Sequence, residues 1–239
     1  MCPVVEGYSF GMRISKAALL TGLLGLLLAT VGCSQNVVGT ALPDATRVPL
    51  TLSADEYGIV AGFDDAPSQI EIFTEPQCTH CRDLQSNFGE QLAYYIAVGE
   101  LQVTYRPLTF IDDDYDGYSS KVANALFLAV EPVGDAAATG TQFQRLVEDL
   151  WVNQQTGGPA FTGDELRDMA IGAGIPASVA DNIAGQRQIV DVADMENVNF
   201  ELLFDIDSAQ TGTPTVYDLE AGEKLDVYDD NWLDDLVQS

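Results

Sequence analysis

The spacing of apolar residues predicts a strand, a helix and a second strand in consecutive segments of the chain. Residues 70–74 form a short apolar run and residues 101–108 alternate between apolar and polar side chains, so we expect a strand in each place. Residues 78–98 between them carry a large apolar side chain at every fourth position, which predicts a long helix ending at Gly99: Leu84, Phe88, Leu92 and Ile96. A strand, a helix and a second strand in this order predict a parallel βαβ unit.

The second half of the chain predicts a block of helices followed by a hairpin. Periodic apolar positions interrupted by proline and glycine indicate helices within about residues 117–205: 119–131, 140–154, 164–174, 177–184 and 187–204. We interpret their largest side chains as core rather than a substrate-binding patch: Phe127, Leu128, Phe143, Leu146, Leu150 and Trp151. Two strands at 215–219 and 224–228 and a short helix at 232–237 follow. With a short strand at 57–62, the pattern predicts an α/β fold with a helical insertion between its two halves.

The first 33 residues have the pattern of a signal peptide. Arg13 and Lys16 precede the apolar run 17–29, which is short for a membrane span of about 20 residues. Its end, with Cys33 after small residues, resembles a bacterial lipobox. That resemblance implies that Cys33 is diacylated and becomes a membrane-anchored N-terminus. Thr30 stands where leucine is usual, so an uncleaved or simply secreted form is the alternative.

This leader fixes the expected domain organisation and redox environment. We expect a signal peptide at residues 1–33, a flexible tether at 34–55 and one folded domain at 56–239. The protein would then work outside the cytoplasm, where disulfides form and persist.

The charge of the chain excludes some partners. It has 10 basic and 37 acidic residues, and without residues 1–32 it has 8 and 36, a net charge of −28. Nucleic acid is excluded because phosphate binding needs a basic surface. Anionic lipid headgroups would also repel the domain, which leaves the acyl anchor as its only contact with a membrane. We interpret the acidic clusters near the end of the chain as solvated surface: Asp226, Asp229, Asp230, Asp234 and Asp235.

Cys78-Thr79-His80-Cys81 is the strongest candidate for chemistry. Two cysteines three positions apart in the first turn of a helix can form a disulfide, and the free N–H groups there stabilise a thiolate. We expect Cys78 to be the exposed nucleophile, Cys81 its partner, and His80, if protonated, a further stabiliser of the anion. Half of a zinc site or a pair of inert thiols are the alternatives, but few other cysteine or histidine ligands are present. This chemistry needs no cofactor.

Two acidic features near the cysteines carry weaker hypotheses. Glu75 could relay protons to the thiol of Cys81 or raise a thiol pKa by repulsion, although a plain surface carboxylate explains it equally well. Asp112, Asp114 and Asp116 followed by Gly117 match the first half of a calcium loop, but Ala123 occupies the position of its last carboxylate. The simpler interpretation is that Asp116 or Ser119 caps the next helix.

The residues together resemble the DsbA-like family of thioredoxin-fold proteins. The resemblance rests on residues 65–81 with the cysteine pair, on the helical insertion, and on Thr211-Gly212-Thr213-Pro214-Thr215, which is similar to the family's cis-proline segment. It covers about residues 56–237. It implies a thioredoxin fold, βαβ then ββα, with a cis bond before Pro214 and Thr213 presenting its backbone to substrate. An ordinary trans proline leading a strand is the alternative. Thr79 replaces the proline usual between the cysteines.

The resemblance also implies a function. The chain would be a thiol–disulfide oxidoreductase that acts on exported proteins bearing cysteines in the oxidising direction, with an unidentified membrane partner that restores its redox state. Reduction or isomerisation by the same residues is the alternative direction. Nothing in the sequence argues for a dimer, so a monomer is expected. The second hypothesis is a lipid-anchored binding protein or chaperone whose cysteines form a static disulfide.

Overall fold

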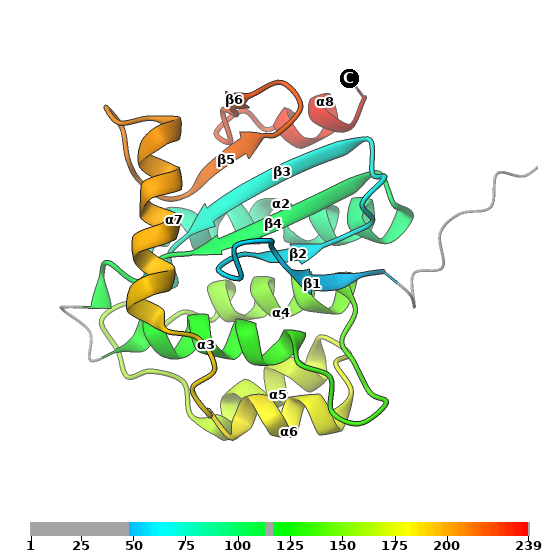
Figure 1. Cartoon of the computed structure of the whole chain (residues 1–239), viewed down its shortest axis with the longest axis vertical. Helices are drawn as coiled ribbons and strands as arrows, with labels where there is room; N and C mark the ends of the chain where they lie inside the picture. The colour runs from blue at the N-terminus through cyan, green and yellow to red at the C-terminus, as the bar shows by residue number, and fades with distance from the viewer. Residues whose placement is uncertain (1–47, 113–116, 239) are drawn as a thin grey trace, which may run out of the picture. The chain divides into compact units, whose positions relative to one another are not determined.

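A single mixed sheet organises the described part of the chain, which in the computed structural model comprises residues 48–112 and 117–238. Its strand order is β1-β2-β4-β3-β5-β6, with these bounds: β1 (Leu50–Leu52), β2 (Ile59–Ala61), β3 (Ser68–Thr74), β4 (Leu101–Pro107), β5 (Thr215–Asp218) and β6 (Glu223–Lys224). The central pair β3 and β4 is parallel and the other pairs are antiparallel (Figure 1). The predicted βαβ unit and closing hairpin are therefore confirmed.

The helices follow the predicted order closely. They are α2 (Thr79–Val98), α3 (Tyr118–Val130), α4 (Gly140–Val152), α5 (Gly163–Gly172), α6 (Ala177–Ala184), α7 (Val192–Ile206) and α8 (Trp232–Gln238). Gly99 ends α2 with a φ of 79°, the left-handed conformation that glycine adopts without strain. Helix α7 begins five residues later than the predicted 187, because the Asp191 carboxylate caps it by accepting the N–H groups of Ala193 and Asp194.

One face of the sheet is covered by α2 and by the part of the helical insertion that precedes α7. Ile70 and Ile72 of β3 point to this side and belong to the main core, with the four apolar residues predicted for α2. All six residues interpreted as core in the insertion are also buried. A buried polar link joins three elements here: the Tyr105 hydroxyl donates to the side-chain oxygen of Gln144, whose amide donates to Gln85 at 2.8 Å. The insertion is thus fixed to α2 and β4.

Helix α7 covers the opposite face near the carboxyl ends of β3 and β4 (Figure 1). Phe73, which alternates with Ile72, packs there against Leu108 and Leu203 in a separate small core. Beside it, the guanidinium of Arg106 is 2.7 Å from Asp55 and 2.8 Å from Glu71. Because this guanidinium is buried, its two carboxylate partners offset the cost of removing the charge from water.

Asn199 connects α7 to two backbone segments. Its side chain is fully buried and donates to the carbonyl oxygens of Tyr57, at 3.0 Å, and Pro107, at 2.8 Å. Tyr57 precedes β2 and Pro107 ends β4, so one amide group hydrogen-bonds to the backbone at the ends of two strands.

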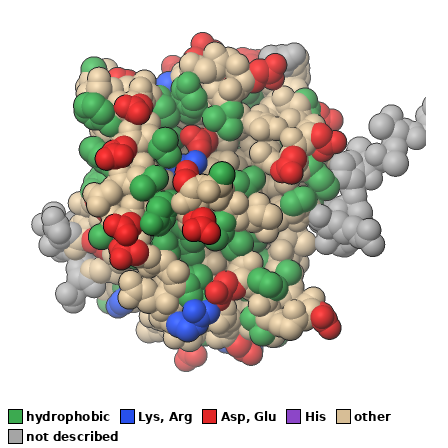
Figure 2. Space-filling view, viewed as in Figure 1, with side chains coloured by type: hydrophobic (Ala, Val, Ile, Leu, Met, Phe, Trp, Pro, Cys, Tyr) green, Lys and Arg blue, Asp and Glu red, His purple; other side chains and the backbone are tan. Residues whose placement is uncertain are grey.

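Besides the late start of α7, the structure differs from the sequence-based picture in other places. The hairpin strand predicted at 224–228 is the shorter β6, Glu223–Lys224. Residues 50–52, expected in the tether 34–55, form β1 and pair with residues 59–61 of β2. Asp234, expected to be simply solvated, accepts a hydrogen bond from the Tyr95 hydroxyl at 2.7 Å and so ties α8 to α2. Most other carboxylates do lie on the surface, where Figure 2 shows many acidic and few basic side chains on the viewed face. Within the described ranges, no helix has the length and apolar character to cross a membrane.

We expect Asn199→Ala to lower the free energy of unfolding by about 2–4 kcal/mol, because it removes the amide group that donates to the part-buried carbonyl oxygen of Tyr57 and the buried one of Pro107. Urea unfolding measures the change. Asn153→Ala is the matched control, since Asn153 is exposed and its amide donates only to the Asp149 carbonyl within its own helix end. An equal, small loss in both variants would contradict the prediction.

Candidate active site

The two cysteines sit at the junction between β3 and α2. Strand β3 ends at Thr74, three residues follow, and Cys78 is the residue that begins α2, with extended backbone angles (φ −70°, ψ 119°). Its N–H donates to the Glu75 carbonyl at 3.0 Å, which closes a tight turn. Cys78 is half-buried, Cys81 is fully buried, and both are free thiols in this structure. The predicted contrast between an accessible and a hidden sulfur is therefore present.

The surroundings of Cys78 favour its thiolate. The Cys81 thiol, the largest contributor, donates a hydrogen bond that lowers the Cys78 pKa, and the Thr213 side chain and the N–H groups of Cys81 and His80 act the same way. Partial burial opposes them, and the resulting pKa of Cys78 is about 6. The helix start supplies the N–H groups, because the first residues of a helix have no carbonyl partner for them.

Cys81 has the opposite environment. Burial raises the pKa of its thiol well above the ordinary value, and the hydrogen bond to Cys78 and the negative charge of Cys78 raise it further. Hydrogen bonds from the Glu75 backbone and the Thr74 side chain only partly offset this. Cys81 therefore remains protonated while Cys78 ionises, and it is the natural donor of the hydrogen bond between them.

Thr79 and His80 both have exposed side chains. The His80 ring lies edge-on to Tyr228, with ring centroids 6.2 Å apart. The contribution of His80 that lowers the Cys78 pKa is its backbone N–H. The role that we predicted for its imidazole stays a prediction.

The segment before β5 lies next to Cys78. The bond between Thr213 and Pro214 is cis, as the family resemblance implies. The Thr213 carbonyl accepts a hydrogen bond from the Cys78 thiol at 3.2 Å. The register of the sheet explains why these two segments are close. Phe73 of β3 pairs with Thr215 of the antiparallel β5, so the residues that follow Phe73 lie beside those that precede Thr215.

Glu75 is not the plain surface carboxylate that was one of its two interpretations, since none of its surface is exposed. The pKa of Glu75 is raised to about 7, chiefly because the carboxyl group is buried. Hydrogen bonds from the Ser119 hydroxyl and from the Gln77 N–H, at 2.6 Å, lower the pKa, whereas the negative charges of Cys78 and Asp112 raise it. A carboxyl group with this pKa can both give and accept a proton near neutral pH.

The helical insertion holds the segment 75–78 through side chains that sequence reasoning missed. The Trp151 indole donates to the Glu75 carbonyl at 3.2 Å, and the Gln154 amide donates to the carbonyls of Pro76 at 2.9 Å and Cys78 at 3.2 Å. Trp151 was predicted only as a core residue, and nothing in the sequence marks Gln154. Both contacts join residues more than 70 positions apart, so no local pattern could have shown them.

A surface hollow of about 460 Å³ lies beside the cis-proline segment. Thr213, Pro214 and Thr215 line one side of it, and residues of β6 and the following loop line the other: Lys224, Asp226 and Tyr228. It therefore extends from the neighbourhood of Cys78 along the start of β5.

The calcium hypothesis remains untested, because Asp114 and Asp116 lie outside the described residues. Asp112 accepts the N–H groups of Ser119, at 2.5 Å, and Ser120, at 2.7 Å, and so caps α3. The alternative in which Ser119 is the cap is wrong, since its hydroxyl donates to Glu75 instead. Among residues 48–112 and 117–238, no three acidic, histidine or cysteine side chains gather in a way that could hold a metal ion.

In the reduced protein, we expect one fast-reacting thiol whose rate of alkylation by iodoacetamide rises with a midpoint near pH 6, because the Cys78 pKa is about 6 and Cys81 is buried and protonated. Cys81→Ala removes the strongest stabiliser of the thiolate, so its midpoint should move upward. A midpoint near the ordinary cysteine value of about 8.5 in the unmodified protein would contradict the described environment.

The Glu75 carboxyl group should make stability depend on pH. The pKa of Glu75 is about 7 in the folded protein and 4.5 in the unfolded protein. Between these values the carboxyl group ionises in the unfolded state but not in the folded state, which favours unfolding. The free energy of unfolding therefore falls as the pH rises from about 4.5 to about 7 and then levels off. We expect Glu75→Gln to be more stable than the parent at pH 8, by up to about 3 kcal/mol, and to differ little from it at pH 4. Chemical unfolding of the reduced proteins measures this, with the exposed Glu220→Gln as control. A difference that does not grow with pH would contradict the prediction.

Comparison with known proteins agrees with this geometry. Two similar solved structures are MdbA proteins, described as thiol-disulfide oxidoreductases. The one from Corynebacterium matruchotii has a TM-score of 0.60 and 19% identity and covers 75% of this chain and 87% of that chain. The one from Corynebacterium diphtheriae has a TM-score of 0.59 and 22% identity and covers 79% and 94%. DsbA of Chlamydia trachomatis has a TM-score of 0.54 and 20% identity and covers 75% and 87%.

At these low identities, the structural likeness shows a shared fold alone. No curated protein sequence matches the chain. Residues 54–196, more than half of the chain, match the family described as thioredoxin, and they contain the parallel βαβ unit, the cysteine pair and most of the helical insertion. The chain therefore belongs to the thioredoxin family.

Proposed function

We propose that the protein is an extracytoplasmic thiol–disulfide oxidoreductase that exchanges disulfides with exported proteins, most often as an oxidant. The observation that carries this proposal is the half-buried Cys78 thiol, with a pKa of about 6, hydrogen-bonded to the Thr213 carbonyl beside a cis-proline. The similar structures described as thiol-disulfide oxidoreductases support it.

The geometry suggests one order of events in the oxidising direction. A substrate thiolate attacks the Cys78 sulfur of the Cys78–Cys81 disulfide, the bond between the two enzyme sulfurs breaks, and Cys81 leaves as a thiolate. A second substrate thiolate then attacks the substrate sulfur of the mixed disulfide and releases Cys78 as a thiolate. The substrate loses two electrons and gains a disulfide. The enzyme becomes a dithiol, which a membrane partner would reoxidise.

The pKa values of the two thiols favour this direction. A Cys78 thiolate that is stable at neutral pH is a good leaving group, and its stability favours the reduced enzyme, which makes the disulfide form a stronger oxidant. Cys81 is buried with a raised pKa, so the thiolate formed there must take up a proton. The carboxyl group of Glu75, with a pKa of about 7, is the proposed donor.

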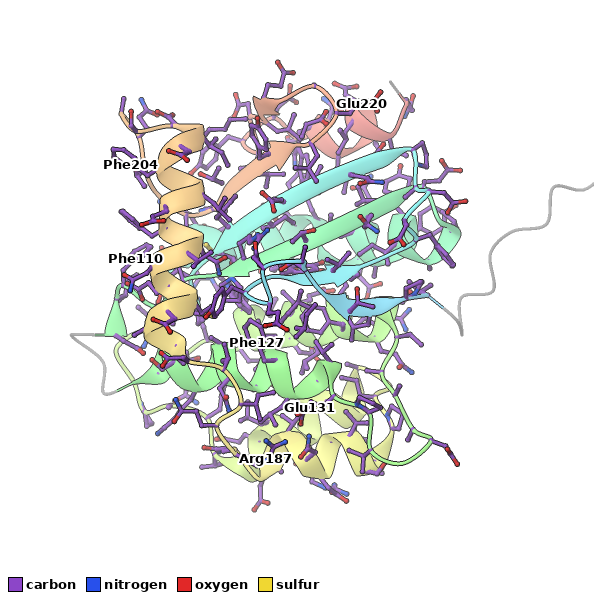
Figure 3. All side chains as sticks on the ribbon, viewed as in Figure 1. Phe110, Phe127, Glu131, Arg187, Phe204 and Glu220 are labelled. Atoms are coloured by element: carbon purple, nitrogen blue, oxygen red, sulfur yellow. The ribbon has the colours of Figure 1, made fainter. Side chains whose placement is uncertain are left out.

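The surface around the site suits an extended polypeptide. Thr213 and Pro214 stand at the start of β5, where the backbone of an incoming peptide could pair with that of Thr213, and the hollow lined by Tyr228 continues from there. Phe110 and Phe204, with 40% and 48% of their surface exposed, lie on the side of the molecule where β3 and β4 end (Figure 3). Exposed aromatic side chains there would contact the apolar residues of unfolded substrates.

The remaining parts of the proposal concern location and assembly. Acylation at Cys33 would anchor the protein to the outer side of the cell membrane, and the strongly acidic domain would otherwise stay off anionic lipid. We propose a monomer.

Oxidative refolding of a reduced, disulfide-containing substrate tests the function. We expect Cys78→Ser to abolish the acceleration of substrate refolding. Cys81→Ser should trap the mixed disulfide that Cys78 forms with an oxidised or activated substrate, and a non-reducing gel detects this species. Ser86→Ala, at an exposed position of α2, serves as the control variant. Undiminished acceleration by Cys78→Ser would favour the binding-protein or chaperone hypothesis instead.

A further inference from the structure

The side chain of Ser119 hydrogen-bonds to Glu75 and takes no part in capping its own helix. It lies in the first turn of α3, has no exposed surface, and donates its hydroxyl hydrogen bond to the Glu75 carboxylate. The adjacent Ser120 shows the alternative available on the same helix, because its hydroxyl donates to Asp112. One of two neighbouring serines is thus directed at the buried acid and the other at the helix cap.

The other groups around the Glu75 carboxylate interact with it differently from the Ser119 hydroxyl. From its own segment, the Gln77 N–H donates to one carboxylate oxygen, and the Cys78 charge faces it. From α3 and the loop before it, Tyr118 and Asp112 interact with it electrostatically. The α4 residue Trp151 reaches only the Glu75 backbone. Among the described residues, Ser119 is the one side chain that hydrogen-bonds to the carboxylate.

We propose that Ser119 is a positioning residue that orients Glu75 and lowers its proton affinity, so that the helical insertion tunes the acid serving Cys81. A carboxylate this deeply buried would otherwise hold its proton too tightly to exchange it near neutral pH, because burial disfavours its charged form. The Ser119 hydroxyl stabilises the charged form from within the protein.

The proposal rests on the assignment of Glu75 as proton donor in the proposed function. When the substrate sulfur displaces Cys81, the Cys81 thiolate takes the proton from the Glu75 carboxyl group. The resulting carboxylate accepts hydrogen bonds from the Ser119 hydroxyl and the Gln77 N–H and then regains a proton from water. Ser119 is neither a donor nor an acceptor of the transferred proton in this sequence; it sets how readily Glu75 releases it.

Infrared spectroscopy of the reduced full-length protein tests the coupling directly. The carboxyl band of Glu75, assigned by subtracting the spectrum of Glu75→Gln, is followed across a pH series. Ser119→Ala should move its midpoint upward by about one pH unit or more, since a hydrogen bond to a charged group contributes about 1.5–3 kcal/mol. Ser120→Ala should leave the midpoint unchanged, and Ser119→Thr, which keeps the hydroxyl, should hold it near the parent value. An unmoved midpoint in Ser119→Ala, or equal shifts in both alanine variants, would overturn the proposal.

The pH profile of oxidative refolding separates this inference from the proposed function. Ser119→Ala should shift the profile in the parent protein but add nothing in the Glu75→Gln background, because its effect passes through that carboxyl group. An additional shift in the Glu75→Gln background would overturn the proposal. If the parent protein showed no refolding activity while the infrared midpoint still moved, the proposed function would fail and the coupling of Ser119 to Glu75 would stand.

Discussion

The contrast between two thiols separated by one helical turn is the constraint on which the site depends. Cys78 begins α2, where unpaired N–H groups, the Cys81 thiol and the Thr213 side chain favour its charge. Cys81 faces the core, where burial forbids a charge. A single turn of helix can provide both environments only if its start is held at the boundary between core and surface, so the surrounding fold must fix that start firmly.

Two parts of the fold supply this restraint from opposite sides. The sheet register of β3 with β5 brings the cis-proline segment beside the Cys78 sulfur. The helical insertion binds the segment before Cys78 through Trp151 and Gln154 and encloses Glu75 at the same time. The insertion therefore does more than enlarge the domain, because it also shields the Glu75 carboxyl group from water. The raised pKa of Glu75 is a consequence of that enclosure.

The other face of the sheet is organised by polar groups as much as by apolar ones. Arg106 is paired with two carboxylates, and Asn199 satisfies the ends of two strands, while the apolar contact between α7 and β3 is small. The Asn199 hydrogen bonds are directional, so they fix where α7 crosses the carboxyl ends of β3 and β4. Phe204, on α7, is one of the exposed aromatic side chains on the side of the molecule where β3 and β4 end.

The sequence by itself predicted the element order, the core residues and the cysteine pair of the candidate site, because hydrophobic period and short-range spacing are local properties. Some of the predicted element boundaries were wrong. The Asp191 carboxylate caps α7, which therefore begins later than predicted, and strand pairing with β2 includes residues 50–52 in the sheet. Only the tertiary structure decided that Glu75 is buried, that Asp112 caps α3, and that Trp151, Gln154 and Ser119 converge on the segment before Cys78. Apart from the Asp112 cap, these contacts join residues more than 40 positions apart. Burial and pKa depend on that three-dimensional neighbourhood, which no local pattern encodes.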